Sequence, residues 1–285
     1  MNTQGVAAVL RDDDKFFCRL ERNFHHTKGL TQMILSAHNL SIGYIAQNGA
    51  TTTVLHDFSF DFAKGQMVMI LGASGLGKSS LLRCLANLQM PLSGSLNMAD
   101  TTQTAFVFQS PALLPWLTVK ENVAFGLNFK QQRAPNTLPI DDILDEVGLS
   151  DCADKYPSEL SGGMASRVAL ARALVRCPNL IFLDEPFTAL DAFTKNSMQQ
   201  LLKRLVKTHS TAAVMVTHDI DEALLLADRI VLLGQGRLID EWHLDDNFHR
   251  QSDDSGYQRI RKEILNALSM AQENRQQMDA EELVV

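Results

Sequence analysis

The sequence predicts an α/β fold with a mainly parallel sheet, and three observations carry that expectation. Short continuous apolar runs at 67–71, 180–183 and 213–216 are typical of strands buried on both faces by helices. Segments with helical spacing, 78–88 and 192–207, follow the first two runs. A residue pattern typical of phosphate binding joins the first run to its helix. Alternating strands and helices of this kind form parallel sheets.

Composition excludes several other classes. The chain has 285 residues, 45% hydrophobic and 21% charged, which suits a globular protein and excludes a collagen-like or wholly disordered one. No apolar stretch approaches the roughly 20 residues of a membrane span. The net charge of -7 disfavours a broad nucleic-acid surface. Cysteines 18, 84, 152 and 177 show no CxxC pairing, so neither a zinc site nor a disulfide framework is predicted.

The chain divides by pattern into three parts. Residues 1–32 mix charges with little periodicity, and we expect a loosely ordered extension, with Met33 as an alternative start. Apolar residues from Ile34 to Ile42 partly alternate, as in a strand, and open the main domain, 33–240. Helix signals without a buried strand predict a helical insertion at about 112–165. The tail, 241–285, is expected to hold an amphipathic helix whose apolar face comprises Tyr257, Ile260, Ile264, Leu265 and Leu268.

A P-loop pattern follows the first buried run directly. Its glycines let backbone amides curl around phosphate oxygens, and the helix N-terminus adds a favourable dipole. Lys78 supplies a charge to the outer phosphates, and the Ser79 hydroxyl is a magnesium ligand. The strand–loop–helix context makes an accidental glycine-rich turn a poor alternative. The predicted nucleotide-binding residues of this loop and helix are Gly72, Ala73, Ser74, Gly75, Leu76, Gly77, Lys78, Ser79 and Ser80.

Two acidic residues end the second buried run. Asp184 at the carboxyl end of a strand lies where an α/β fold holds a metal, here Mg²⁺. Glu185 is placed to accept a proton from an attacking water. Taken alone, such a pair is more often an exposed turn, but its occurrence with a P-loop favours a site.

A third motif, Ser161, Gly162, Gly163 and Met164, precedes the helical run 167–175. Ser161 is a suitable N-cap, and the two glycines expose backbone amides at the helix start. A simple capped helix is the alternative in isolation. The order of the motifs, after the P-loop and shortly before Asp184, favours a functional role.

Together these motifs resemble the nucleotide-binding subunit of an ATP-binding cassette (ABC) transporter, over roughly residues 34–240. The resemblance implies a P-loop NTPase (RecA-like) core, an antiparallel β subdomain and a helical insertion. It also implies roles for individual residues: adenine stacking by Tyr44, with a surface tyrosine as the alternative; Mg²⁺ contact and sensing of the membrane subunit by Gln109; binding of the opposite subunit's ATP by Ser161, Gly162 and Gly163; a dimer contact by Asp191; and γ-phosphate contact by His218.

The resemblance implies an ATPase with ATP and Mg²⁺ as cofactors, acting as a head-to-tail dimer of two copies. Its expected partners are an integral-membrane permease and, indirectly, a solute-binding protein, at the cytoplasmic face of the inner membrane. Met164, where Gln is usual, residues 114–119 after Gln109 and residues 218–223 resemble the branch that imports nitrate, taurine, alkanesulfonates and thiamine-pyrimidine precursors. Residues 113–117 either dock the permease or pack locally. The alternative function is a soluble ABC ATPase acting on nucleic acid or ribosomes; the single cassette favours transport, with no nucleic-acid partner.

Overall fold

The structure, a computed structural model, describes residues 32–282 except 47, 101, 128–136 and 246–247, with side chains described as far as Ala271. From Met33 onward the chain forms one compact unit. The predicted N-terminal extension lies outside the described residues, apart from Gln32. None of the helices in these ranges is long and apolar enough to cross a membrane.

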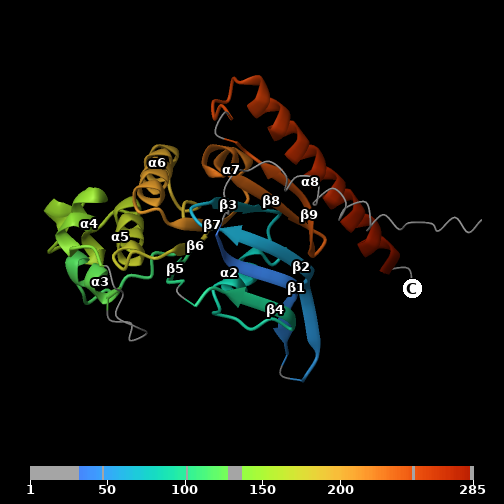
Figure 1. The fold of residues 1–285 in the computed structure, drawn as a ribbon, viewed down its shortest axis with the longest axis horizontal. Coiled ribbons are helices and arrows are strands. Elements are labelled where there is room, and N and C mark those ends of the chain that lie inside the picture. The colour runs from blue at the N-terminus through green and yellow to red at the C-terminus, as the bar shows by residue number, and fades with distance from the viewer. Residues whose placement is uncertain (1–31, 47, 101, 128–136, 246–247, 283–285) are drawn as a thin grey trace, which may run out of the picture. The chain divides into compact units, whose positions relative to one another are not determined.

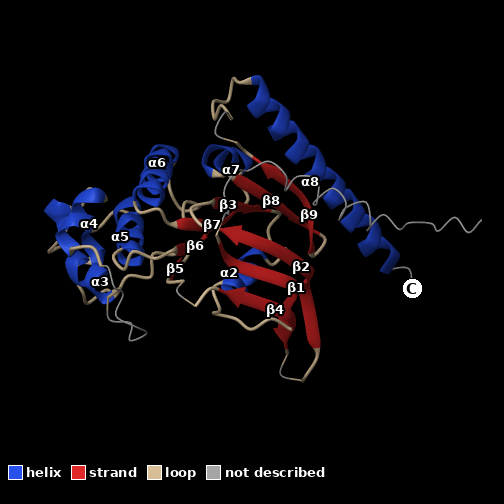
Figure 2. Cartoon of the chain, viewed as in Figure 1, coloured by secondary structure: helices blue, strands red, loops and turns tan. Residues whose placement is uncertain are grey.

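A six-stranded sheet forms the centre of this unit, in the order β5-β6-β7-β3-β8-β9 (Figures 1 and 2). All neighbouring pairs are parallel except β8 with β9, so the predicted mainly parallel sheet is confirmed. Its strands are β3 (Met67–Leu71), β5 (Thr104–Val107), β6 (Leu180–Asp184), β7 (Ala212–Thr217), β8 (Arg229–Gly234) and β9 (Arg237–His243).

Helices cover one face of the sheet, and a second sheet together with one helix covers the other, which explains the continuous apolar runs. Every residue of β3, β6 and β7 is buried. Successive side chains of a strand point to opposite faces. Accordingly, Met67 and Met69 pack in one apolar core, whereas Val68 and Ile70 pack in the other.

The helices of the first face come from α5 (Gly162–Leu174), α6 (Ala192–Thr208) and α7 (Ile220–Leu226), and α2 (Lys78–Leu85) packs in the opposite core. Two predicted helices are therefore present, and α2 is three residues shorter than the spacing suggested. It ends at Leu85 because Asn87 adopts a left-handed backbone, with φ of 57°, which a helix cannot continue.

The second sheet is antiparallel, as the resemblance implied. Its order is β2-β1-β4, formed by β1 (Met33–Ile45), β2 (Thr51–Ala63) and β4 (Ser93–Met98). Phe58, Phe60 and Phe62 alternate along β2 and are all buried against the central sheet's second core. Irregular register between β1 and β2 at several points interrupts the period-2 pattern. This explains why the strand at residues 34–42 shows only partial alternation.

The described part of 112–165 is helical and contains no strand. It holds α3 (Val119–Phe125), α4 (Ile140–Glu146), two short 3-10 helices, η1 (Ser150–Cys152) and η2 (Pro157–Glu159), and the start of α5. These helices gather at one end of the unit (Figure 1). Buried Asn122 donates to the carbonyls of Leu114 and Leu117, which orders the segment that leads into α3.

A long C-terminal helix, α8 (Ser255–Glu282), lies along the edge of the central sheet near α7 and β8 (Figure 1). Tyr257, Ile260 and Ile264 are buried, as the apolar spacing predicted. Leu265 is not on that face: 40% of it is exposed. The buried stripe follows positions 257, 260 and 264 and continues to the partly buried Leu268. A residue one position after Ile264 lies about 100° around the helix.

Candidate functional site

The P-loop lies between β3 and α2, and its glycines adopt the conformations that such a loop needs. Gly75 and Gly77 have φ of 82° and 79°, in the region that only glycine enters freely. The Lys78 ammonium folds back over the loop and donates to the carbonyl oxygens of Gly72 and Ala73, each at 2.9 Å. The loop therefore closes around its own lysine, beside the helix N-terminus.

Gly77 and Gly75 offer a matched test of this geometry. A Cβ at Gly77 would lie 2.6 Å from Cγ1 of Val54, whereas a Cβ at Gly75 meets nothing within 4 Å. Both alanine variants incur left-handed backbone strain of about 1–2 kcal/mol. We expect Gly77→Ala to lose about 1–3 kcal/mol more, since it also overpacks against Val54. Denaturant unfolding without nucleotide measures the difference, and equal losses in the two variants would contradict the close approach of Val54 to Gly77.

Asp184 and Ser79 meet although 105 positions separate them. The Ser79 hydroxyl donates to Oδ1 of Asp184 at 2.6 Å, and Nη2 of Arg83 lies 3.5 Å from Oδ2. Asp184 is 3% exposed, so almost no water can reach this carboxylate to stabilise its negative charge. The pairing follows from the sheet order, which places β6 two strands from β3 with all three strands parallel.

These two oxygens fit Mg²⁺. The ion is bound by hard oxygen ligands, commonly one or two carboxylates, with substrate phosphates and water completing the octahedron. The described residues contain no cluster of three or more acidic, histidine or cysteine side chains that could hold a metal by themselves. A site of one hydroxyl and one carboxylate beside a phosphate loop therefore fits a metal that arrives with a nucleotide.

Lys78 is held in an unusual electrostatic environment. It is 5% exposed, and its ammonium lies 3.9 Å from Oε1 of Glu185. Burial lowers the pKa of Lys78 from its ordinary value, while the charges of Glu185 and Asp184 act in the opposite direction. A phosphate group entering the loop would add negative charge beside this desolvated ammonium, where Coulomb attraction is strong.

Glu185 and His218 form a second pair at the ends of β6 and β7. Oε2 of Glu185 lies 3.3 Å from Nδ1 of His218 and accepts a hydrogen bond of 3.0 Å from the Thr188 hydroxyl. Glu185 has φ of 43°, which is rare for a residue with a side chain. Thr188 was not predicted from the sequence, although a hydroxyl three residues after a strand-end acid is a readable signal.

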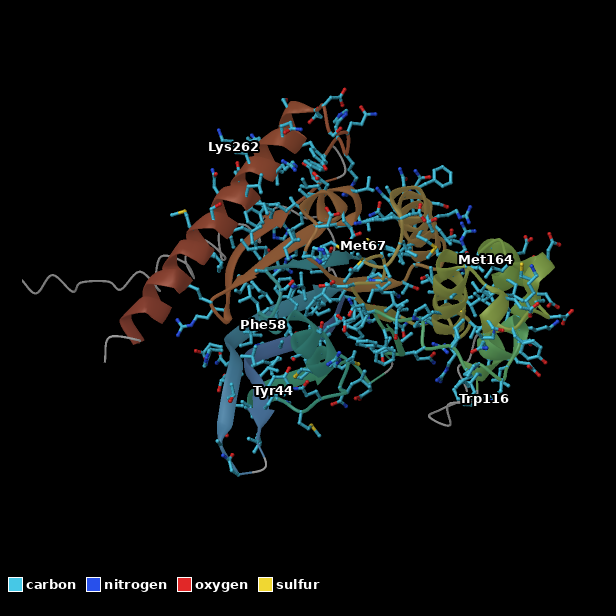
Figure 3. The ribbon with its side chains drawn as sticks, turned by 180° about the vertical axis from the view of Figure 1, so that it is seen from behind. Tyr44, Phe58, Met67, Trp116, Met164 and Lys262 are labelled. Carbon is cyan, nitrogen blue, oxygen red and sulfur yellow. The ribbon has the colours of Figure 1, made fainter. Side chains whose placement is uncertain are left out.

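Tyr44 is brought to the P-loop helix. It lies near the end of β1 (Figure 3). It is 55% exposed, and its hydroxyl is 2.6 Å from Oγ of Ser80. Ser80 is buried, and the Tyr44 hydroxyl is the hydrogen-bond partner of its Oγ. The ring of Tyr44 is open to a flat ligand, which fits the predicted stacking role, whereas Ser80 anchors the tyrosine. Adenine stacking by Tyr44 and nucleotide binding by Ser80 both stay predictions.

The Ser161 motif begins α5. The Ser161 hydroxyl accepts from the Met164 amide at 3.3 Å, so the predicted N-cap is present. Gly162 is exposed, and a Cβ added there would meet no atom within 4 Å. A Cβ added at Gly163 would lie only 2.5 Å from Cγ2 of Thr194, so Gly163 packs closely against that side chain. Asp191 caps α6 and accepts from the Thr194 amide at 3.1 Å. The Ser161 motif and Asp191 are therefore neighbours.

These two motifs are separate from the P-loop. Among the described residues, no hydrogen bond or ion pair joins Ser161, Gly162, Gly163 or Asp191 to the loop or to Asp184 and Glu185. Gln109 is exposed after β5 and lines a small pocket with Ser166 of α5 and Pro186. The predicted residues therefore fall into a P-loop cluster and an exposed α5–α6 face, with Gln109 between β5 and α5.

The parallel sheet, the closed P-loop and the serine–aspartate pair define a P-loop nucleotide-binding protein. A family model described as "ABC transporter" matches residues 55–188. The aliphatic sulfonates import ATP-binding protein SsuB of Granulibacter bethesdensis is 45% identical over 231 residues, covering 81% of this chain and 94% of the relative. Its namesake from a Mycobacterium species is 47% identical over 221 residues, covering 77% and 89%. The chain belongs to the ABC transporter ATP-binding family.

Solved structures similar to this chain support the same family. A dimeric ATP-binding cassette, MJ0796, in a post-hydrolysis state bound to ADP and Pi, is 31% identical with a TM-score of 0.64, covering 74% of this chain and 99% of that one. CbiO1 of Clostridium perfringens, part of an ABC transporter complex, is 28% identical with a TM-score of 0.63, covering 74% and 88%. The chain is thus an ABC ATPase, which binds ATP with Mg²⁺ and hydrolyses it to ADP and phosphate to power transport.

Proposed function

We propose that this chain energises the import of an aliphatic sulfonate or a similar small anion through a separate membrane permease. The observation that carries the proposal is the contact of the P-loop with Asp184 and Glu185, in a chain 45% identical to a sulfonate import ATP-binding protein over 94% of that protein's length. The solute is selected by partner proteins, so the proposal for the solute rests on the relatives alone.

The P-loop cluster would perform hydrolysis as follows. Lys78 and the loop amides hold the β- and γ-phosphates, and the Ser79 hydroxyl and Asp184 carboxylate hold Mg²⁺. Bound Mg²⁺ neutralises charge that develops on the phosphate oxygens. Glu185 accepts a proton from the attacking water, and His218, 3.3 Å from Glu185, contacts the γ-phosphate. Thr188 donates to the carboxylate and fixes its direction.

The exposed α5–α6 face would complete the site of a second copy. Ser161 and Gly162 present a hydroxyl and an open helix N-terminus, which suits an anion, but they make no contact with this chain's own P-loop cluster in the described residues. A head-to-tail dimer places this face over the partner's ATP, with Asp191 at the contact. The cassette MJ0796 forms a dimer.

The helical insertion would carry motion to the permease. Trp116 is 69% exposed on that insertion (Figure 3), whereas Leu113 packs against the apolar core. The 113–117 cluster thus combines local packing with an exposed aromatic that can dock. Gln109 lies at its entrance and would relay nucleotide state. As a subunit of an ABC transporter the chain is peripheral to the membrane, and we propose the cytoplasmic face of the inner membrane.

Reconstitution tests this function. The chain, its permease and the solute-binding protein are placed in liposomes, and uptake of a radiolabelled alkanesulfonate is followed with and without internal ATP. We expect uptake only with ATP and Mg²⁺, and stimulated hydrolysis when the loaded binding protein is present. Stimulation by nitrate but by neither alkanesulfonates nor taurine, which is itself an aliphatic sulfonate, would reject the sulfonate assignment. Purification with ribosomes or RNA and no permease would reject transport in favour of the soluble alternative.

A further inference from the structure

A cluster of charged side chains fastens α6 to α7. The Lys195 ammonium donates to Oδ2 of Asp219 at 2.7 Å and lies 3.2 Å from Oε1 of Glu222. One turn further along α6, Gln199 donates to the same oxygen of Glu222 at 2.9 Å. One lysine therefore joins two carboxylates of the neighbouring helix, 24 and 27 positions away along the chain.

The cluster is largely withdrawn from solvent. Lys195 is 25% exposed and Glu222 4%, so the attraction between them is screened much less than in a surface pair. Burial lowers the pKa of Lys195, but the hydrogen bond to Asp219 and the charge of Glu222 more than offset this, so the pKa lies above its ordinary value. The ammonium is thus fixed in its charged form between its two partners.

The carboxylate partner at Asp219 follows His218 directly. Oδ1 of Asp219 caps α7 by accepting from the Glu222 amide, and the Asp219 amide donates to the Thr217 hydroxyl, each at 3.1 Å. Thr217 is buried at the end of β7. Both neighbours of His218 are thereby held, while His218 itself is 51% exposed and touches Glu185 only through Nδ1 at 3.3 Å.

The other end of Lys195 belongs to the exposed α5–α6 face. The Lys195 amide donates to the Asp191 carbonyl at 2.8 Å, in the first turn of the helix that Asp191 caps. Lys195 therefore connects Asp191, the proposed dimer contact, with the turn at His218, the proposed γ-phosphate contact. Neither the P-loop nor the insertion takes part in this connection.

We infer that Lys195 is a positioning residue for ATP hydrolysis. By binding Asp219 and Glu222, it keeps the His218 imidazole at the correct distance from Glu185. This inference rests on the role proposed for His218. Lys195 itself touches neither nucleotide nor reacting water; it acts by restricting where the His218 backbone can move. Loss of the ammonium leaves Asp219 as a cap but frees the turn to shift away from α6.

Steady-state hydrolysis by the full chain tests the inference with three lysine variants. We expect Lys195→Met to lower kcat about tenfold, with KM for ATP changed less than about twofold, since transition-state geometry and not binding is disturbed. Lys195→Arg keeps the charge and should retain kcat within about threefold. Lys207→Met, the same replacement at an exposed position of the same helix, should match the original chain. A kcat for Lys195→Met equal to that of Lys207→Met would overturn the inference.

A double-mutant cycle separates positioning from simple loss of structure. If Lys195 acts through His218, Lys195→Met should lower kcat by less than about twofold once His218 is alanine. A full tenfold loss in that background would show independent action and overturn the inference. An unchanged kcat for His218→Ala alone would instead reject the proposed role of His218. Should Lys195→Met fail to fold, Asp219→Asn, which keeps the cap, is carried through the same cycle with the same expected outcomes.

Discussion

Glu185→Gln is expected to bind ATP and to hydrolyse it about 10²–10⁴-fold more slowly, which is the contribution of a general base. The amide keeps the size of the side chain and can still accept from Thr188, but it cannot take a proton from water. Loss of a negative charge beside Lys78 should leave nucleotide affinity equal or higher, because Oε1 of Glu185 lies 3.9 Å from that ammonium. Single-turnover hydrolysis and equilibrium nucleotide binding measure the two effects separately.

The variant should also accumulate ATP-bound dimers, seen as an earlier peak in size exclusion with ATP and Mg²⁺. Glu263→Gln on α8 is the matched control, since its side chain is half exposed and distant in sequence from the cluster, and it should turn over normally. A Glu185→Gln chain with unchanged kcat would remove Glu185 from the role of base. A chain that neither hydrolyses nor binds ATP would show that the substitution had disrupted the loop.

Lys78→Ala should reduce ATP affinity about 10- to 100-fold, from the loss of a charge-assisted contact worth about 1.5–3 kcal/mol. The ammonium also bridges the carbonyls of Gly72 and Ala73, so its removal loosens the loop before nucleotide arrives. Without the Lys78 ammonium, no cation of the loop separates the negative charges of Asp184 and Glu185 from the phosphates. The resulting repulsion lowers the affinity for ATP further.

Titration with a fluorescent ATP analogue measures this loss directly. Lys64→Ala, an exposed lysine in the turn before β3, is the matched control and should bind as the original chain does. Thermal unfolding without nucleotide shows whether both variants are folded. Tight binding by a folded Lys78→Ala chain would contradict the assignment of the phosphate site.

The buried strands were predictable because their signal is local. Both faces of β3, β6 and β7 are covered, so each appears as an unbroken apolar run. Residues 230–233 of β8 carry the same signal and could have been found on the same grounds. The strand β1 was predicted in part, from the incomplete alternation of residues 34–42. The bulged register of β1 and β2 obscures their alternation, and β4 is mostly exposed, so β2 and β4 were not predicted.

The site divides in the same way. The P-loop could be predicted because one short segment supplies the strand, the glycines and the helix start. The contact between Ser79 and Asp184 depends on sheet order, which the spacing of the two residues does not specify. Lys195 and Glu222 were not predictable as partners, since nothing in either segment states that α6 and α7 lie side by side. Leu265 shows the converse error, where neighbours in sequence do not share a helix face.

The left-handed backbone at Glu185, with φ of 43°, has a consequence for directed evolution. Glycine and asparagine adopt this conformation more readily than glutamate, so the position keeps an acid at some expense of folding free energy, of order 1–2 kcal/mol. A library selected only for heat resistance should therefore enrich glycine there, and with it chains that fold better and no longer turn over. Screens for heat-resistant variants of this protein therefore need to select for ATPase activity as well, from the first round.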